Sequence, residues 1–331
     1  MDLFSSIQIK NIEFANRIVM APMVPFSNLY HNSGIINSVL LDFYKKRATS
    51  GIGLIISQSL NVATDHKVDG FASIYSKEQM KPLEIVVDFL HQNNTRFFTQ
   101  LAFPKVGSHD NQLLNSMSTN EIQHLINDFV MAARLSKLSG CDGIELHGAH
   151  GFFLNMLLSN EYNHRKDAYG GSLENRLRFV REVIEKIGKF TDDNFVISYR
   201  MGWSDSTETD IQIASELEKM GVSLLHISYG LRPKRIFDFP ENYSYNETVY
   251  AGTLLKKTLK IPIIVVDDIQ TLSRGNDLIE NKRSDFVAYG RPFLADYNFV
   301  YNSSNDPCYR PCIKCKKCLW FTDGTLCPAK L

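Results

Sequence analysis

The most constraining feature of this sequence is a repeated pair of patterns, a short apolar run followed by a longer amphipathic stretch. Both sides of the strand register are apolar in these runs, as expected for parallel strands that are covered on both faces. Strands that alternate with helices in this way predict a parallel α/β fold. The eight runs lie at 17–21, 53–58, 96–101, 142–147, 195–200, 223–228, 262–266 and 285–290.

The stretches between the runs have helical periodicity. Residues 121–139 place their apolar side chains on one helical face, with Thr119 as the expected N-cap and Gly140 beyond the C-terminal end. Residues 173–187 repeat the pattern, with Ser172 as the expected N-cap. Helices of this kind between the strands support the α/β assignment.

Two parallel α/β architectures compete, an open doubly wound sheet and a closed barrel. The open sheet ordinarily carries a glycine-rich phosphate loop after its first strand, but the sequence has neither a G-x-G-x-x-G motif nor a P-loop. We therefore expect a single (β/α)8 TIM barrel over 1–300, followed by a short Cys-rich C-terminal extension over 301–331, here called the tail. A barrel of about 250 residues with extensions fits the chain length of 331 residues.

Charge and hydropathy exclude several classes of partner. Lys and Arg together number 36, as do Asp and Glu, so no overall basic field attracts nucleic acid or an anionic membrane. Residues 1–10 lack the apolar core of a signal peptide, and no apolar run approaches the roughly 18 residues of a membrane span. We expect a cytoplasmic protein without nucleic-acid or membrane partners.

Polar side chains lie where the predicted strands end, which is the position at which barrels carry their catalytic groups. A single histidine at such a position is more often a satisfied surface residue than a functional one. Here an amide, two imidazoles, a guanidinium and a glycine–arginine pair fall on one predicted rim, which favours a functional site. These residues are Gln100, His147, His150, Arg200, Gly290 and Arg291.

Three segments carry a resemblance to a known family. Residues 3–23 read LFSSIQIKNIEFANRIVMAPM, residues 147–179 read HGAHGFFLNMLLSNEYNHRKDAYGGSLENRLRF, and residues 285–296 read DFVAYGRPFLAD. Together they resemble the old yellow enzyme family of FMN-dependent reductases, over the chain from Leu3 to about Ala295. The resemblance implies an enzyme that binds FMN and passes hydride from NADH or NADPH to an electron-poor small molecule, such as an enone, a quinone or a nitro compound.

The resemblance also implies roles for individual residues in binding the cofactor. Ser59 and Gln100 would hydrogen-bond the isoalloxazine ring, and Arg200 would lie near its N1/O2 edge, where a cation tunes hydride transfer. Gly290 and Arg291 would hold the phosphate through a backbone N–H and the guanidinium, at the phosphate site usual for barrels. The residues that would pack against the flavin, largely through their backbone, are Ala21, Pro22 and Met23.

His147 and His150 would donate hydrogen bonds to the carbonyl or nitro oxygen of the acceptor. Negative charge grows on that oxygen when hydride adds to an enone, and each fixed donor would stabilise it by roughly 2–4 kcal/mol, as in an oxyanion hole. The H-x-x-H spacing is also compatible with metal ligands. Because no third His or carboxylate ligand is evident in the sequence, this second interpretation ranks well below the first.

Several positions depart from the family pattern. Phe152 stands where the family often has a proton-donating tyrosine, and Phe26 aligns with a substrate-side tyrosine of some members, so both are assigned to a substrate pocket that is unusually apolar. An aromatic or bulky substrate would suit such a pocket. Asp267 replaces the first glycine of a phosphate loop. A carboxylate there repels phosphate unless it points away or pairs with a cation such as Arg291.

The tail contains five of the six cysteines. A C-x2-C-x2-C run, followed after eight intervening residues by a Cys-Pro pair, is typical of a four-iron cluster site. It is similar to the cluster region of the larger dienoyl-CoA reductase and trimethylamine dehydrogenase relatives, whose final gap is longer. We predict a [4Fe-4S] cluster or, as second choice, a tetrahedral Zn site, with unligated thiols as the alternative. The predicted ligands are Cys312, Cys315, Cys318 and Cys327.

Two other functions compete with the oxidoreductase. An RNA-modifying flavin barrel of the dihydrouridine-synthase type is disfavoured by the neutral charge and by the His147/His150 pair. A flavin-binding protein without turnover is suggested by Phe152 and Asp267. Family members are often dimers or tetramers, but no pattern in these residues decides the oligomeric state, which leaves a homo-oligomer open.

Overall fold

The structure, a computed structural model, describes the chain except for residues 25–33, 65–71, 104–109, 204, 232–238, 307 and 330–331. At its centre is a closed barrel of parallel strands in the order β10–β3–β4–β5–β6–β7–β8–β9. The expected (β/α)8 barrel is therefore confirmed, and each predicted apolar run forms one of its strands. The strands are Ile18–Met20 (β3), Leu54–Asn61 (β4), Arg96–Ala102 (β5), Gly143–Gly148 (β6), Val196–Gly202 (β7), Leu224–Ser228 (β8), Ile263–Val265 (β9) and Phe286–Tyr289 (β10).

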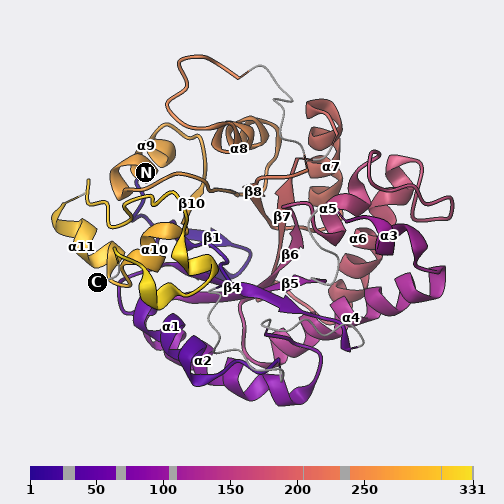
Figure 1. The fold of residues 1–331 in the computed structure, drawn as a ribbon, viewed down its shortest axis with the longest axis horizontal. Helices are drawn as coiled ribbons and strands as arrows, with labels where there is room; N and C mark the ends of the chain where they lie inside the picture. The colour runs from indigo at the N-terminus through magenta and orange to yellow at the C-terminus, as the bar shows by residue number, and fades with distance from the viewer. Residues whose placement is uncertain are drawn as a thin grey trace.

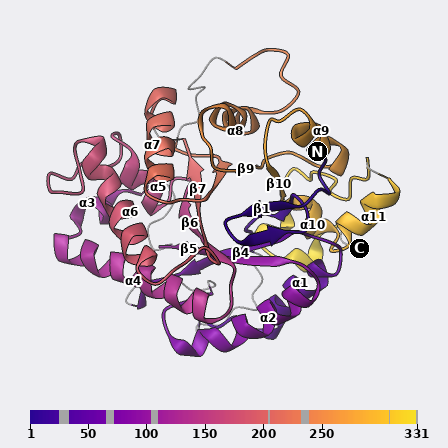
Figure 2. The same ribbon diagram turned by 180° about the vertical axis from the view of Figure 1, so that it is seen from behind.

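Helices surround the barrel on its outside (Figures 1 and 2). In the part of the chain that the structure describes, no helix combines the length and the apolar character needed to cross a membrane. The helices are Ser38–Ala48 (α1), Met80–Gln92 (α2), Gln112–Ser116 (α3), Thr119–Leu138 (α4), Phe153–Leu158 (α5), Leu173–Gly188 (α6), Thr207–Lys219 (α7), Glu247–Thr258 (α8), Leu272–Glu280 (α9), Arg291–Ala295 (α10) and Phe299–Asn305 (α11). A short 3-10 turn, Lys77–Gln79 (η2), precedes α2.

The starts of the two helices examined in the sequence show how local hydrogen bonding sets a boundary. At α6, the Ser172 side chain accepts a hydrogen bond from the Asn175 N–H, as expected of an N-cap. At α4 the expected N-cap, Thr119, is wrong, because the cap is Ser118. Its hydroxyl accepts from the Glu121 N–H (3.2 Å), while the Glu121 carboxylate accepts from the Ser118 N–H (2.7 Å). This reciprocal capping box satisfies two N–H groups at once, which favours a start one residue earlier.

An N-terminal hairpin, formed by Ile7–Ile9 (β1) and Ile12–Phe14 (β2), closes the barrel at the end where the strands begin. Its apolar side chains cluster with Leu54, Leu224 and Phe286, the first residues of β4, β8 and β10. The Phe14 ring packs edge-on against the Phe286 ring with centroids 5.4 Å apart. Figure 2 shows this hairpin from the side opposite to the view in Figure 1. Access to the barrel interior is therefore left to the other end.

The tail returns to the barrel after α11 and forms two 3-10 turns, Leu319–Phe321 (η3) and Gly324–Leu326 (η4). The Trp320 ring packs edge-on against Phe43 of α1, with centroids 6.2 Å apart. The Tyr309 hydroxyl donates a hydrogen bond of 3.1 Å to Asp296, the residue that ends α10. These contacts hold the tail beside α1 and α10, as the yellow segment in Figure 1 shows.

Candidate active site

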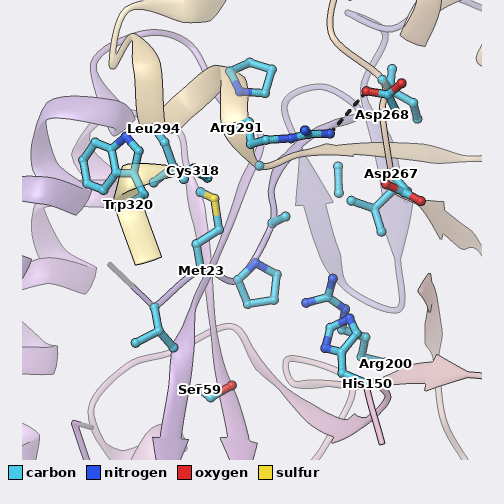
Figure 3. Close-up of a pocket in the computed structure, with 18 of the residues that line it drawn as sticks. Met23, Ser59, His150, Arg200, Asp267, Asp268, Arg291, Leu294, Cys318 and Trp320 are labelled. Atoms are coloured by element: carbon cyan, nitrogen blue, oxygen red, sulfur yellow. Dashed lines mark hydrogen bonds and ion pairs between the residues drawn. The ribbon is translucent and has the colours of Figure 1, made fainter. Parts of the chain in front are cut away.

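A cavity of about 650 Å³ lies at the C-terminal ends of the barrel strands, within the usual volume range of ligand sites. Figure 3 shows His150 and Arg200 at one end of it and Arg291 at the other, with Met23 between them. Every residue predicted to bind cofactor or acceptor lines this cavity, except Phe26, which lies outside the described residues. The lining residues that had been predicted are Ala21, Pro22, Met23, Ser59, Gln100, His147, His150, Phe152, Arg200, Gly290 and Arg291.

One chain of hydrogen bonds runs from the cavity into the barrel interior. The Ser59 hydroxyl donates to the Gln100 amide oxygen (2.5 Å), and the Gln100 amide nitrogen donates to Glu145 Oε1 (2.8 Å). The other carboxylate oxygen, Glu145 Oε2, bonds to His226 Nδ1 (2.9 Å). All four side chains are buried. Glu145 thereby fixes which end of the Gln100 amide faces Ser59.

Inside the barrel, the negative charge of Glu145 and the positive charge of Arg200 stabilise each other. Burial by itself would raise the pKa of Glu145, but His226, Arg200 and the Gln100 hydrogen bond outweigh it, so its pKa is lowered. Burial, aided by Arg200, lowers the pKa of His226 against the opposing pull of Glu145, so this imidazole is neutral and donates from Nδ1. Burial also lowers the pKa of Arg200, to about 10, which still leaves the guanidinium charged at neutral pH.

A second chain of hydrogen bonds joins the two predicted catalytic histidines to Arg200. His147 Nε2 and His150 Nδ1 share a hydrogen bond of 3.0 Å, and His150 Nε2 shares one of 2.8 Å with the Ser228 hydroxyl. Arg200 Nη2 donates to the same hydroxyl at 3.0 Å. Ser228 therefore links the guanidinium to the histidine pair, and it lies at the end of β8.

Both histidines of this pair are neutral. Burial, reinforced by Arg200, lowers the pKa of His147 to about 3 and that of His150 well below its ordinary value. A neutral imidazole has one N–H to donate. Here the two rings are hydrogen-bonded to each other. An acceptor oxygen bound between them would break that hydrogen bond and accept hydrogen bonds from the rings instead. The arrangement suits a polar oxygen that gains negative charge during a reaction.

The lowered histidine pKa values predict a loss of stability in acid. An unfolded histidine binds a proton below about pH 6.5, whereas folded His147 stays neutral until about pH 3. Between these values the unfolded state binds more protons, so the free energy of unfolding should fall as the pH falls. Urea unfolding of the apoprotein at about pH 7.5 and 5.5 measures this. The variant His147→Asn/His150→Asn should show a smaller fall, whereas His164→Asn, at an exposed position, should not differ from wild type.

The opposite end of the cavity contains Arg291 and two aspartates from the loop after β9. Asp267 and Asp268 have φ angles of 100° and 51°, in the left-handed region that favours glycine. Asp268 pairs with Arg291 at 3.2 Å and with Lys314 of the tail at 2.8 Å. Burial raises the pKa of Asp267 with a further contribution from Asp268, while Arg291 opposes it. The ion pair with Arg291 is thus formed by Asp268, the residue after the glycine position that Asp267 occupies.

The lining residues fit the predicted FMN. Arg200 lines the cavity, and its buried Nε has no hydrogen-bond partner among the described residues, so it retains a donor for a ligand. Ser59 and Gln100 supply polar groups at the same end. At the far end Gly290 leaves the backbone accessible, since a Cβ there would already approach the Met23 sulfur to 3.3 Å. Arg291 supplies a cation suited to phosphate.

Phe152 forms part of the cavity wall next to the histidine pair. Its ring centroid lies 5.3 Å from that of His147, and its backbone forms the N-cap of α5. Phe103, in the segment after β5, is buried and packs edge-on against Phe153 at 5.4 Å rather than lining the cavity. Beside His147 the cavity therefore has an aromatic wall at the position of Phe152, and that side chain has no dissociable proton.

The sequence interpretation missed three residues of the hydrogen-bonded chains. Ser228 ends β8 just as Arg200 lies near the end of β7, so the same strand-end signal would have found it. Glu145 and His226 each lie two positions before a rim residue on the same strand. Because side chains two apart in a strand face the same side, this polar alternation indicates a second polar layer inside the barrel.

The four cysteines predicted to ligate a metal line one small cavity of about 30 Å³ beside α10, and two of them, Cys315 and Cys318, also line the 650 Å³ cavity. Among the residues that the structure describes, however, no three His, Cys, Asp or Glu side chains come together in a way that could hold a metal ion. The predicted [4Fe-4S] or Zn site therefore has no support in the structure.

Comparison with known proteins connects this site to a family. The sequence model of the NADH:flavin oxidoreductase / NADH oxidase family matches residues 2–305. An NADH oxidase of Thermoanaerobacter brockii is 33% identical over 327 residues, which cover 89% of this chain and 49% of that protein, so the chain spans about half its length. An NADPH dehydrogenase of Clostridium acetobutylicum is 29% identical over 328 residues, covering 92% and 95% of the two chains.

Solved structures with the same fold include a morphinone reductase and an old yellow enzyme homologue. Morphinone reductase in complex with tetrahydroNAD has a TM-score of 0.75 at 22% identity, over 95% of this chain and 93% of the other. The old yellow enzyme homologue from Zymomonas mobilis has a TM-score of 0.77 at 20% identity, over 98% and 97%. These likenesses concern the fold.

Proposed function

Because this chain belongs to the NADH:flavin oxidoreductase / NADH oxidase family, it is an FMN-dependent oxidoreductase, and we propose that its cofactor binds in the 650 Å³ cavity. There it would receive hydride from NADH or NADPH and deliver it to an electron-poor small molecule. Relatives named NADH oxidase and NADPH dehydrogenase leave both nicotinamides as donors. The alternating use of one site by donor and acceptor explains why the sequence needs no separate dinucleotide fingerprint.

The observation that supports this placement best is the distribution of polar groups along the cavity. Ser59, Gln100 and Arg200 lie at one end, and Gly290 and Arg291 lie at the other. A flavin ring with hydrogen-bonding groups on one edge and a ribityl phosphate at its far end matches this order. When bound, FMN supplies the redox chemistry that no side chain of the protein can supply.

The side chains of the protein would orient and stabilise the reacting groups. Gln100, whose amide is oriented by Ser59 and Glu145, would present a fixed hydrogen-bonding group to the edge of the ring. Arg200 would place a buried positive charge at the same edge, where its hydrogen bond to Ser228 holds the guanidinium and the negative charge of Glu145 stabilises it. His147 and His150 would hold the oxygen of the acceptor. The β1–β2 hairpin closes the barrel at the end where the strands begin. The nicotinamide and the acceptor would therefore enter at the C-terminal ends of the strands.

An anaerobic reduction experiment tests the proposed function. Protein reconstituted with FMN is mixed with NADH or NADPH in the absence of oxygen, and the visible absorbance of the flavin is followed. We expect at least one donor to bleach the flavin and a quinone to restore its colour. A yellow protein that neither donor reduces would contradict the oxidoreductase and support a flavin-binding protein without turnover.

A further inference from the structure

We propose that the tail is part of the FMN site, with Lys316 contacting the phosphate of the cofactor and Lys314 neutralising Asp268 so that Arg291 is available to the same phosphate. This inference rests on the proposed function, since it takes FMN to bind in the 650 Å³ cavity with its phosphate near Arg291. It assigns a binding role to a segment that lies outside the barrel.

The loop after β9 creates an electrostatic problem for a phosphate ligand. Asp268 already occupies the Arg291 guanidinium at 3.2 Å, and Asp267 adds a second carboxyl group to the cavity lining. A phosphate monoester brings a further charge of about −1.5 to −2. With Arg291 as sole cation, the carboxylate and the phosphate would compete for one guanidinium and repel each other.

The tail brings the missing positive charge to this end of the cavity. Lys314 Nζ lies 2.8 Å from Asp268 Oδ2, on the opposite carboxylate oxygen from the one that faces Arg291. Lys316, two residues further, is itself part of the cavity lining. Arg310 acts on Asp268 in the same sense, because its charge helps to hold the pKa of that carboxyl low. Two tail cations, Lys314 and Arg310, thus act on Asp268, and a third, Lys316, lines the cavity.

Packing contacts hold the tail in the position that this role requires. Cys318 and Trp320 form part of the cavity wall, and Figure 3 shows both beside Leu294 and Met23. Trp320 also packs on Phe43 of α1 at 6.2 Å. Gly324 packs directly against the Trp320 indole, since a Cβ added to this glycine would overlap the ring. The tail is therefore anchored to the barrel next to Lys316 and Lys314.

Flavin titrations of the apoprotein test the proposal. The affinities for FMN and for riboflavin, which lacks the phosphate, are measured by quenching of flavin fluorescence in wild type and in Lys316→Ala, Lys314→Ala and Lys317→Ala. Lys317 is the matched control, because it is exposed and does not line the cavity. We expect Lys316→Ala and Lys314→Ala each to weaken FMN binding about 10-fold, as for a lost charge-assisted contact, without changing riboflavin binding.

A fourth variant separates the two roles. In Lys314→Ala/Asp268→Asn the carboxylate that would compete with the phosphate for Arg291 is gone, so FMN affinity should return to within about 2-fold of wild type. FMN affinity that is unchanged in both single lysine variants would overturn the proposal, as would equal losses for FMN and riboflavin, which indicate a packing role. A wild-type protein that binds neither flavin would instead overturn the proposed function itself.

Discussion

Replacing Phe152 with tyrosine is expected to raise the rate of enone reduction by about 10²-fold or more and to leave quinone reduction unchanged. Enone reduction needs a hydride at the β-carbon and a proton at the α-carbon, and a positioned general acid contributes about 10²–10⁴-fold to such a step. Phe152 lines the cavity beside His147 and has no proton to give. Protons of a reduced quinone or nitro group end on oxygen or nitrogen and can come from water.

The quinone serves as the control acceptor, because its reduction should not depend on a proton donor at position 152. Single-turnover reoxidation of the reduced protein by cyclohexenone and by a quinone is measured in wild type and in Phe152→Tyr at equal flavin loading. Wild type should reduce the quinone faster than the enone, and the substitution should narrow that difference. A fast wild-type enone reaction that the tyrosine leaves unchanged would mean that another group or an ordered water supplies the proton, and that Phe152 is only a wall.

Removing the histidine pair should slow acceptor reduction by about 10²–10³-fold, the usual loss when an oxyanion donor is deleted. Because His147 and His150 share a hydrogen bond, the variants His147→Ala and His150→Ala should not be additive. The double variant should be only slightly slower than the slower single variant. Ser228→Ala, which removes the partner that orients His150, should have a smaller effect of about 10-fold.

Light reduction of the bound flavin keeps the nicotinamide out of this measurement. Each variant is reduced photochemically, its flavin content is checked, and reoxidation by a quinone and by an enone is followed. If the reoxidation rate of the double variant stayed within about 2-fold of the wild-type rate, the loss would be far smaller than that expected for a deleted oxyanion donor. Such a result would show that the histidines do not hold the acceptor.

The barrel could be predicted because each of its strands carries a local signal. A strand covered on both faces is apolar throughout, and this property is visible in five or six consecutive residues. The β1–β2 hairpin was missed although Ile7, Ile9, Ile12 and Phe14 alternate around a two-residue turn, in which Lys10 has a φ of 52°. Each of its strands has only three residues, and the hairpin precedes the repeating strand–helix pattern, so it carries a weaker local signal than the barrel strands.

The site could be predicted only at its rim. Gln100, His147 and Arg200 follow from the rule that strand ends converge on one face, and the structure places all three in one cavity. The position of the tail has no such rule. Lys314 meets Asp268 across 46 residues of sequence, and an irregular segment has no periodicity that would predict where it docks. Cysteine spacing indicated a metal, whereas the observed contacts of the segment are with the cavity.

The tail makes part of the cavity wall independent of the barrel strands. The last barrel strand, β10, ends at Tyr289, whereas Lys314 and Lys316 follow about 25 residues later. Cys318 and Trp320, further along the chain, belong to the lining of the same cavity. A chain cut after α11 would therefore retain all the strands of the barrel but lack this part of the cavity wall.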